Sequence, residues 1–260
     1  MVLDHYKIPN APFVAIPPRV SWPNSKIDLS DVIAHSTHAE LLDTFPLFVK
    51  PSSVSTGIGI SQANKVSNHE ELVEAVEALS NQYPQVALLI ERFLPGREFT
   101  VGILGAGADA RVLGIREIVF IKNGGFPAGS GYVYRDNDPS FSVDVYGHSV
   151  KMETPERYAV CPNPWKKKID LDDPVGKAVA KVALDSWRVL GCRDTGRVDI
   201  RCDSGDPVHA VPNFIEVSNF FFFFLLSGFS TYLLSGKPDC RHDPQVLRLG
   251  WFGDGEWNRL

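Results

Sequence analysis

A lysine and a small-residue loop near the start of the chain are suited to binding an anion. Lys50 ends an apolar run and is followed by Pro51 and a loop that contains Thr56, Gly57 and Gly59. Such a loop can adopt positive φ angles and direct several backbone N–H groups at one anion, and a phosphate is the obvious guest. Glycine-rich turns also serve as plain connections between strands, so the loop alone leaves both interpretations open.

Two acidic residues further along the chain could share one site. The strictly alternating run 196–202 predicts a strand with Arg197, Asp199 and Arg201 on one face. A second strand with Glu216 follows after a short connection, which favours an antiparallel pair with the two acids side by side. Two carboxylates held close repel each other unless cations lie between them, as Mg²⁺-ATP would supply. A structural face of ion pairs is the alternative.

Regular elements are expected around these residues. Ser67 and Glu70 form a capping-box pattern before a helix over 68–82, and Asp173 followed by proline starts a helix over 174–190. A further helix is expected around 30–42. Apolar and alternating runs predict strands at 13–16, 45–49, 86–91, 99–103, 110–120, 196–202 and 213–218.

Bulk composition describes an ordinary globular protein. The 260 residues are 44% hydrophobic and 22% charged, and the formal net charge of -5 gives no reason to expect nucleic acid as a partner. The four cysteines are far apart, which supports neither a zinc site nor a disulfide framework and favours a reducing, cytoplasmic compartment. Residues 1–9 lack the apolar run of a secretory signal. A membrane partner is not expected.

The run 90–101, IERFLPGREFTV, carries a family resemblance. Together with the lysine before the Thr-Gly-Ile-Gly loop and the two carboxylate strands, it resembles the ATP-grasp ligases and, within them, the D-alanine-D-alanine ligase family. The resemblance implies an α+β fold in which two α+β subdomains clamp a nucleotide between antiparallel sheets. Residues 1–90 would form the central subdomain, and residues 91–218 the C-terminal subdomain with the metal and phosphate site.

The same resemblance assigns an adenine pocket to the hinge between the subdomains. Glu91 would face the exocyclic amine, the Leu94 backbone would face the ring edge, and Glu98 would bind the ribose hydroxyls. Arg92 and Phe93 complete the nucleotide-binding hinge. The alternative is that both glutamates are solvated ends of strands.

Phosphate and metal ligands follow from the resemblance as well. Tyr146 and Lys151 match a mobile loop that closes over the phosphates, although Lys151 could also be an ordinary surface lysine. Arg197 would neutralise the transferring phosphoryl group. The ligands of Mg²⁺ or Mn²⁺ would be Asp199, Glu216 and Ser218, the last standing where the family has asparagine.

The resemblance implies an ATP-dependent ligase that joins two D-alanines, or related amino acids, through an acyl phosphate. By this resemblance we expect the N-terminal domain of the family to be missing, because Met1 would stand where the entry to the central domain is already under way. The phenylalanine-rich run 220–224 replaces a Pro-Gly turn, and residues 219–260 are expected to be a mistranslated or disordered tail. The alternative is a catalytically defective ATP-grasp fragment that binds nucleotide only, or a non-functional gene product. A homodimer is left open.

Overall fold

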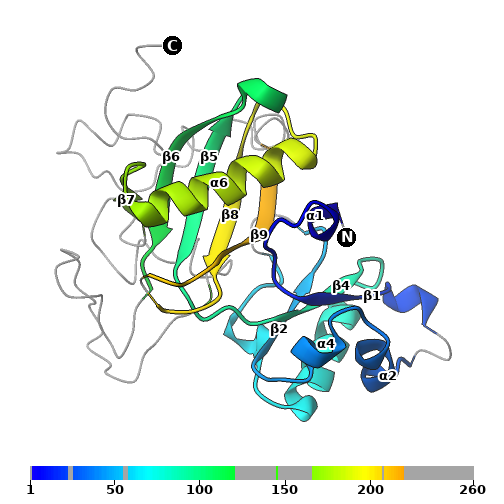
Figure 1. The fold of residues 1–260 in the computed structure, drawn as a ribbon. Helices are drawn as coiled ribbons and strands as arrows, with labels where there is room; N and C mark the ends of the chain where they lie inside the picture. The colour runs from blue at the N-terminus through cyan, green and yellow to red at the C-terminus, as the bar shows by residue number, and fades with distance from the viewer. Residues whose placement is uncertain are drawn as a thin grey trace, which may run out of the picture.

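The chain folds around two antiparallel sheets, one of four strands and one of five, each packed against helices (Figure 1). The computed structural model describes residues 2–22, 26–54, 58–120, 145, 166–206 and 208–219. The expected tail therefore lies outside the described residues from position 220 onward. Within the described residues, every helix falls short of the length and apolar character that a membrane span requires.

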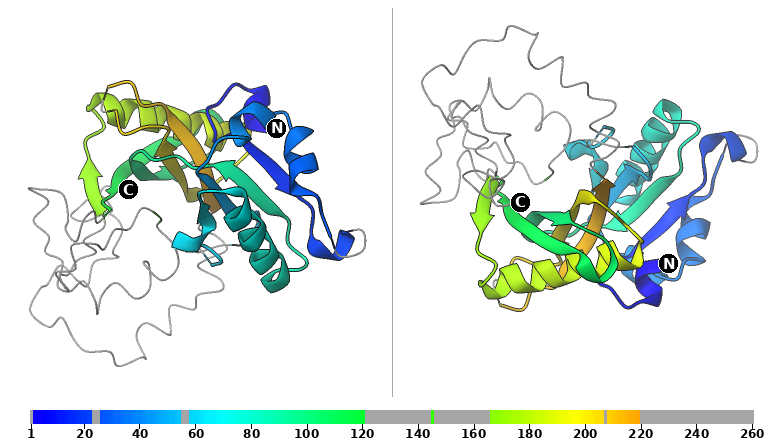
Figure 2. Two further views of the ribbon diagram at one scale, coloured as in Figure 1. Left: turned by 90° about the horizontal axis from the view of Figure 1, so that it is seen from below. Right: turned by 90° about the horizontal axis from the view of Figure 1, so that it is seen from above.

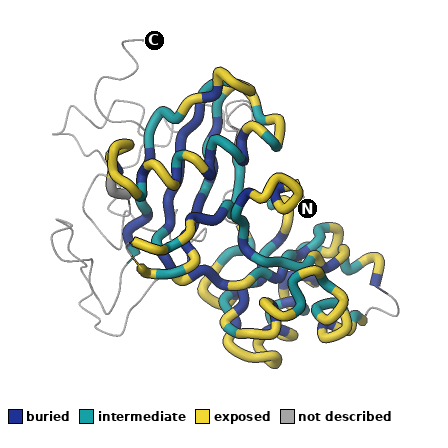
Figure 3. The backbone as a smooth tube through the Cα atoms, in the orientation of Figure 1, coloured by how far each residue is buried: buried dark blue, intermediate teal, exposed yellow. Residues whose placement is uncertain are grey.

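The first sheet belongs to the N-terminal part of the chain. In spatial order its strands are β1 (Phe13–Ile16), β4 (Leu88–Arg92), β2 (Leu47–Pro51) and β3 (Lys65–Val66). Helix α4 (His69–Gln82) packs its buried residues against β2 and β4, because its apolar side chains recur at helical spacing. The face of α4 that points away from the sheet is exposed, whereas the strands beneath α4 are buried or half-buried (Figure 3).

Two local expectations for this half need correction. The expected helix around 30–42 is two short helices, α2 (Leu29–Ala34) and α3 (Ala39–Leu42), separated by a turn. The N-cap of α4 is Asn68, whose side chain accepts from the Glu71 backbone N–H, so the cap lies one residue later than expected. Asparagine caps a helix at least as well as serine, so Asn68 can take the position that was expected for Ser67.

The second sheet carries helix α6 (Pro174–Val189) on one face (Figure 2). Its strands, in spatial order, are β7 (Lys166–Ile169), β6 (Arg111–Ile118), β5 (Glu98–Leu104), β8 (Thr195–Cys202) and β9 (Pro212–Asn219). Alternating apolar residues such as Phe99, Val101, Val198 and Ile200 are fully buried beneath α6. The polar residues between them therefore point to the opposite face.

The two halves are joined closely. Helix α1 (Val2–His5) contributes Leu3 to the core of the second sheet, although β1 follows it in the first. The Phe93 backbone N–H donates to the Pro46 carbonyl at 3.1 Å, and the Gly96 N–H donates to the Cys202 carbonyl at 3.1 Å. The hinge between β4 and β5 is thus hydrogen-bonded to both halves.

Trp187 of α6 is the largest fully buried side chain of the second core. Its Nε1 donates to the Gly105 carbonyl at 3.0 Å, and its ring lies against Gly196, where an added Cβ would come 2.7 Å from the ring. We expect Trp187→Ala to lower the free energy of unfolding by about 3–5 kcal/mol, measured by urea denaturation. The control Val208→Ala, at a position that is 78% exposed, should stay within about 0.5 kcal/mol of the parent. Equal midpoints for the two variants would contradict this packing.

Candidate functional site

Lys50 links the two sheets. Its Nζ lies 2.9 Å from Glu91 Oε2 on the neighbouring strand, and the two side chains are only 14% and 12% exposed. The same ammonium donates to the Ile215 carbonyl on β9 at 3.2 Å. Ile215 is the extra residue of a bulge, since Glu216 pairs with Asp199 while Phe214 pairs with Ile200. A lysine of the first sheet thus reaches the backbone beside an acidic residue of the second.

The two predicted acids lie opposite each other. Asp199 and Glu216 are direct partners in the antiparallel pair β8–β9, as the sequence indicated. Arg197 Nε lies 3.2 Å from Asp199 Oδ2, and Arg197 Nη2 lies 4.0 Å from Glu216 Oε1. The Ser218 hydroxyl donates to Glu216 Oε1 at 3.1 Å. One cation, two carboxylates and a hydroxyl therefore gather on the face of the sheet away from α6.

The donor set is compatible with Mg²⁺. The ion typically binds one or two carboxylates and completes its coordination with water and phosphate oxygens. Asp199 Oδ1 is buried and accepts no hydrogen bond within the described part of the chain, so one carboxylate oxygen has unused capacity. No group of three or more His, Cys, Asp or Glu residues gathers among the described residues. The two acids and Ser218 can hold an ion that shares its ligands with a phosphate.

The hinge residues lie beside this site. Phe93 and Leu94 are buried, whereas Arg92 is exposed and its backbone N–H donates to the Pro12 carbonyl. The Phe93 ring contacts two cations, with Lys65 Nζ at 4.3 Å and Arg201 Cζ at 4.8 Å from its centroid. The hinge side chains are thus held in place by packing and cation–π contacts.

Glu98 forms an ion pair with Arg201, a residue for which no role was predicted. Its carboxylate accepts from Arg201 Nη1 at 3.0 Å, and the two side chains are 11% and 9% exposed. Arg201 also lies over the rings of Phe93 and Phe120, at 4.8 and 5.2 Å. Strand alternation placed Arg201 on the charged face, but only the pairing of Glu98 with Arg201 across β5 and β8 shows the contact. The alternative of a solvated Glu98 does not fit this burial.

The loop predicted to bind phosphate is only partly described. Thr56 and Gly57 lie outside the described residues, as do Tyr146 and Lys151. Gly59 has φ of 76°, a left-handed conformation that favours glycine, and its carbonyl accepts from the buried Asn64 side chain at 2.7 Å. Asn64 also donates to the Val49 carbonyl of β2 at 2.7 Å, which fixes the end of the loop against the sheet.

The described cysteines do not take part in this chemistry. Burial raises the pKa of Cys202 to about 11 and also raises the pKa of Cys192. Both thiols are therefore protonated at neutral pH, which makes them poor nucleophiles and poor metal ligands.

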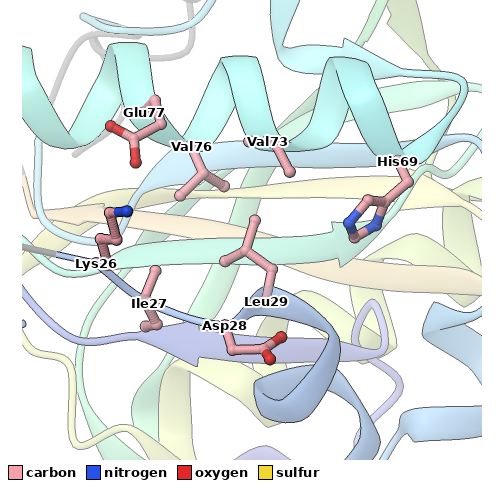
Figure 4. A pocket seen from close by; sticks show the side chains of 8 residues that line it. All are labelled: Lys26, Ile27, Asp28, Leu29, His69, Val73, Val76 and Glu77. Atoms are coloured by element: carbon pink, nitrogen blue, oxygen red, sulfur yellow. The ribbon is translucent and has the colours of Figure 1, made fainter.

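A separate cavity of about 420 Å³ lies in the first half of the chain (Figure 4). Residues 26–29 line one side, and His69, Val73, Val76 and Glu77 of α4 line the other. None of the predicted site residues lines it. The candidate site is therefore defined by side chains at the junction of the sheets rather than by this cavity.

Comparison with known proteins decides the family. Residues 2–232 match the family described as D-ala D-ala ligase C-terminus, which is most of the chain. The chain belongs to this D-ala D-ala ligase C-terminal family. The matched range extends past residue 218 and includes the whole phenylalanine-rich run 220–224.

Curated proteins that resemble this chain agree with the family assignment. It is 31% identical over 159 residues to a D-alanine--D-alanine ligase of Bordetella petrii, covering 61% of this chain and 39% of the relative. It is 30% identical over 182 residues to that of Chlorobium chlorochromatii, covering 67% and 41%. The chain thus spans about 40% of the length of these relatives.

The solved structures support the fold. The D-alanine--D-alanine ligase of Bacillus anthracis superposes with a TM-score of 0.52 at 19% identity, covering 84% of this chain and 53% of that one. This likeness, together with the two antiparallel sheets, shows the ATP-grasp fold expected from the sequence.

The partly buried pair of Lys50 and Glu91 can be tested by a double-mutant cycle. Removing either partner leaves the other charge buried, so Lys50→Met and Glu91→Gln should each lower the free energy of unfolding by about 3 kcal/mol. The double variant should lose clearly less than the sum of the two, in urea denaturation. Additive losses would mean that the two side chains do not interact.

Proposed function

We propose that this chain binds Mg²⁺-ATP at the junction of its two sheets and serves an ATP-dependent ligation of two D-alanines. Family membership supports the reaction class, and the junction supports the site. The observation that carries the proposal is the position of Lys50, whose ammonium contacts the backbone of β9 next to Glu216. Lys50 of the first sheet thus lies close to the acidic residues of the second, where a triphosphate would need both a cation and metal ligands.

The reaction needs no covalent intermediate on the protein. One D-alanine carboxylate oxygen attacks the γ-phosphorus of ATP, the bond to the β-phosphate oxygen breaks, and ADP leaves. The amine of the second D-alanine, having lost a proton, attacks the acyl phosphate, and inorganic phosphate departs as the peptide bond forms. The protein contributes positioning and charge stabilisation.

The phosphate end would be held by Lys50 and the loop. An ammonium has three N–H donors, and Glu91 and the Ile215 carbonyl engage two of them, so one remains for a phosphate oxygen. The backbone of Thr56, Gly57 and Gly59 would add donors. Tyr146 and Lys151 would close over the phosphates.

The metal end would be held by Asp199, Glu216 and Ser218. Held by these residues, Mg²⁺ or Mn²⁺ would supply positive charge against the negative charge that develops on the transferring group. Arg197 is already fixed by both acids and would stabilise the acyl-phosphate oxygens as a second, permanent positive charge.

The base would lie against the hinge. Glu91 Oε1 accepts from no described residue and would receive the exocyclic amine, while the Leu94 backbone would meet the ring edge. Arg92 and Phe93 would flank the base. Glu98 would bind the ribose while it stays paired with Arg201, because a carboxylate has two oxygens and several acceptor positions. We place the reaction in the cytoplasm, in keeping with the cysteine usage.

D-Alanine-dependent phosphate release from Mg²⁺-ATP tests the proposal. The 260-residue chain should turn over, and Asp199→Asn should weaken metal-dependent nucleotide binding by about 10–100-fold and reduce turnover with it. Asp185→Asn is the matched control, because it makes the same change on α6, on the opposite face of the sheet. Nucleotide binding without turnover would instead identify a nucleotide-binding remnant, and no nucleotide binding at all would overturn the proposed site.

A further inference from the structure

Thr100 on β5 lies in one row with the two acids. It pairs directly with Asp199 on β8, and Asp199 pairs directly with Glu216 on β9. Directly paired residues project from the same face of a sheet, with Cβ atoms roughly 5 Å apart. Thr100 therefore points to the face away from α6, toward the predicted metal ligands.

Two adjacent oxygens in this row are buried without a hydrogen bond. Thr100 is 4% exposed, and neither its Oγ1 nor Asp199 Oδ1 has a hydrogen-bond partner among the described residues. A buried hydroxyl or carboxylate oxygen normally has such a partner, because losing its contact with water costs free energy. A polar molecule bound beside these two directly paired positions would satisfy both oxygens.

The hydrogen-bonding chemistry of the two oxygens limits which molecule could bind beside them. A carboxylate oxygen only accepts, while a threonine hydroxyl can both accept and donate, so a molecule with two hydrogens can satisfy both. Water is such a molecule, and Mg²⁺ keeps several of its waters when it binds to protein. A valine would fill the same volume, so packing alone does not require a hydroxyl at this position.

We propose that the Thr100 hydroxyl is a further binding residue of the metal site. It accepts a hydrogen bond from a water of the divalent cation, and the same water donates its second hydrogen to Asp199 Oδ1. This assignment rests on the proposed function, because it requires a cation held by Asp199 and Glu216. Thr100 thereby fixes the orientation of the hydration shell without contacting the ion itself.

Binding of Mn²⁺ tests this role independently of activity. The 260-residue chain and its Thr100→Val and Thr100→Ser variants are titrated with Mn²⁺ in the presence of a non-hydrolysable ATP analogue, and free Mn²⁺ is followed by electron paramagnetic resonance. Thr100→Val should weaken Mn²⁺ binding by about 10-fold, as the loss of outer-shell partners does, and Thr100→Ser should stay within about 2-fold. Asp199→Asn provides the reference for a lost ligand.

Metal-free stability separates binding from a structural role. The methyl group of valine replaces an unsatisfied hydroxyl, so the metal-free Thr100→Val variant should melt at the parent temperature or above it. Unchanged Mn²⁺ affinity in Thr100→Val, or a metal-free melting temperature clearly below that of the parent, would overturn the assignment. A parent chain that binds no Mn²⁺ with the analogue would overturn the proposed function itself, and the role of Thr100 with it.

Discussion

The arrangement depends on one partly buried ammonium, that of Lys50. Lys50 forms an ion pair within the first sheet and a hydrogen bond to the second, and both contacts lie in a poorly hydrated region. Electrostatic contacts are stronger where water is excluded, so this side chain fixes how closely β2 approaches β9. The bulge at Ile215 contributes to this contact, because the extra residue is not paired with β8 and its carbonyl accepts the hydrogen bond from the Lys50 ammonium.

The two faces of the second sheet differ in character: one forms the hydrophobic core, and the other carries the charged side chains of the candidate site. Under α6, apolar side chains such as Phe99, Val198 and Trp187 form a closed core. On the other face, charged side chains of the same strands form ion pairs with one another. Because strand side chains alternate, neighbouring residues of one strand lie in different environments. Asp199, for example, is flanked by the buried Val198 and Ile200.

The sequence predicted a strand or helix correctly where its apolar residues recurred at a single spacing. The alternation of 196–202 and the helical spacing after Asp173 predicted β8 and α6, and the antiparallel pairing of Asp199 with Glu216 followed from the short connection. The hinge motif identified the family because its residues are specific in order as well as in type.

Other features depend on contacts that no local pattern contains. Ser67 and Asn68 are both capping residues, so composition could not determine which one starts α4. The partner of Glu98 is Arg201, 103 residues away, and strand register alone brings them together. The bulge at Ile215 and the unsatisfied Thr100 hydroxyl are likewise properties of the assembled sheet. The roles of the site residues all remain predictions, and Thr56, Gly57, Tyr146 and Lys151 also lie outside the described residues.

The path of the first residues has a mechanical consequence. Helix α1 is anchored in the core of the second sheet, Asn10 bridges to Phe214 of β9, and Phe13 already pairs with Glu91 of the first sheet. In the described part of the chain, the backbone therefore crosses between the two halves twice, near residue 11 and again between β4 and β5. Two parallel tethers resist twisting and leave bending about the line that joins them as the softest relative motion. Any opening of the proposed nucleotide site would then follow that one axis and would separate Lys50 from the Ile215 carbonyl.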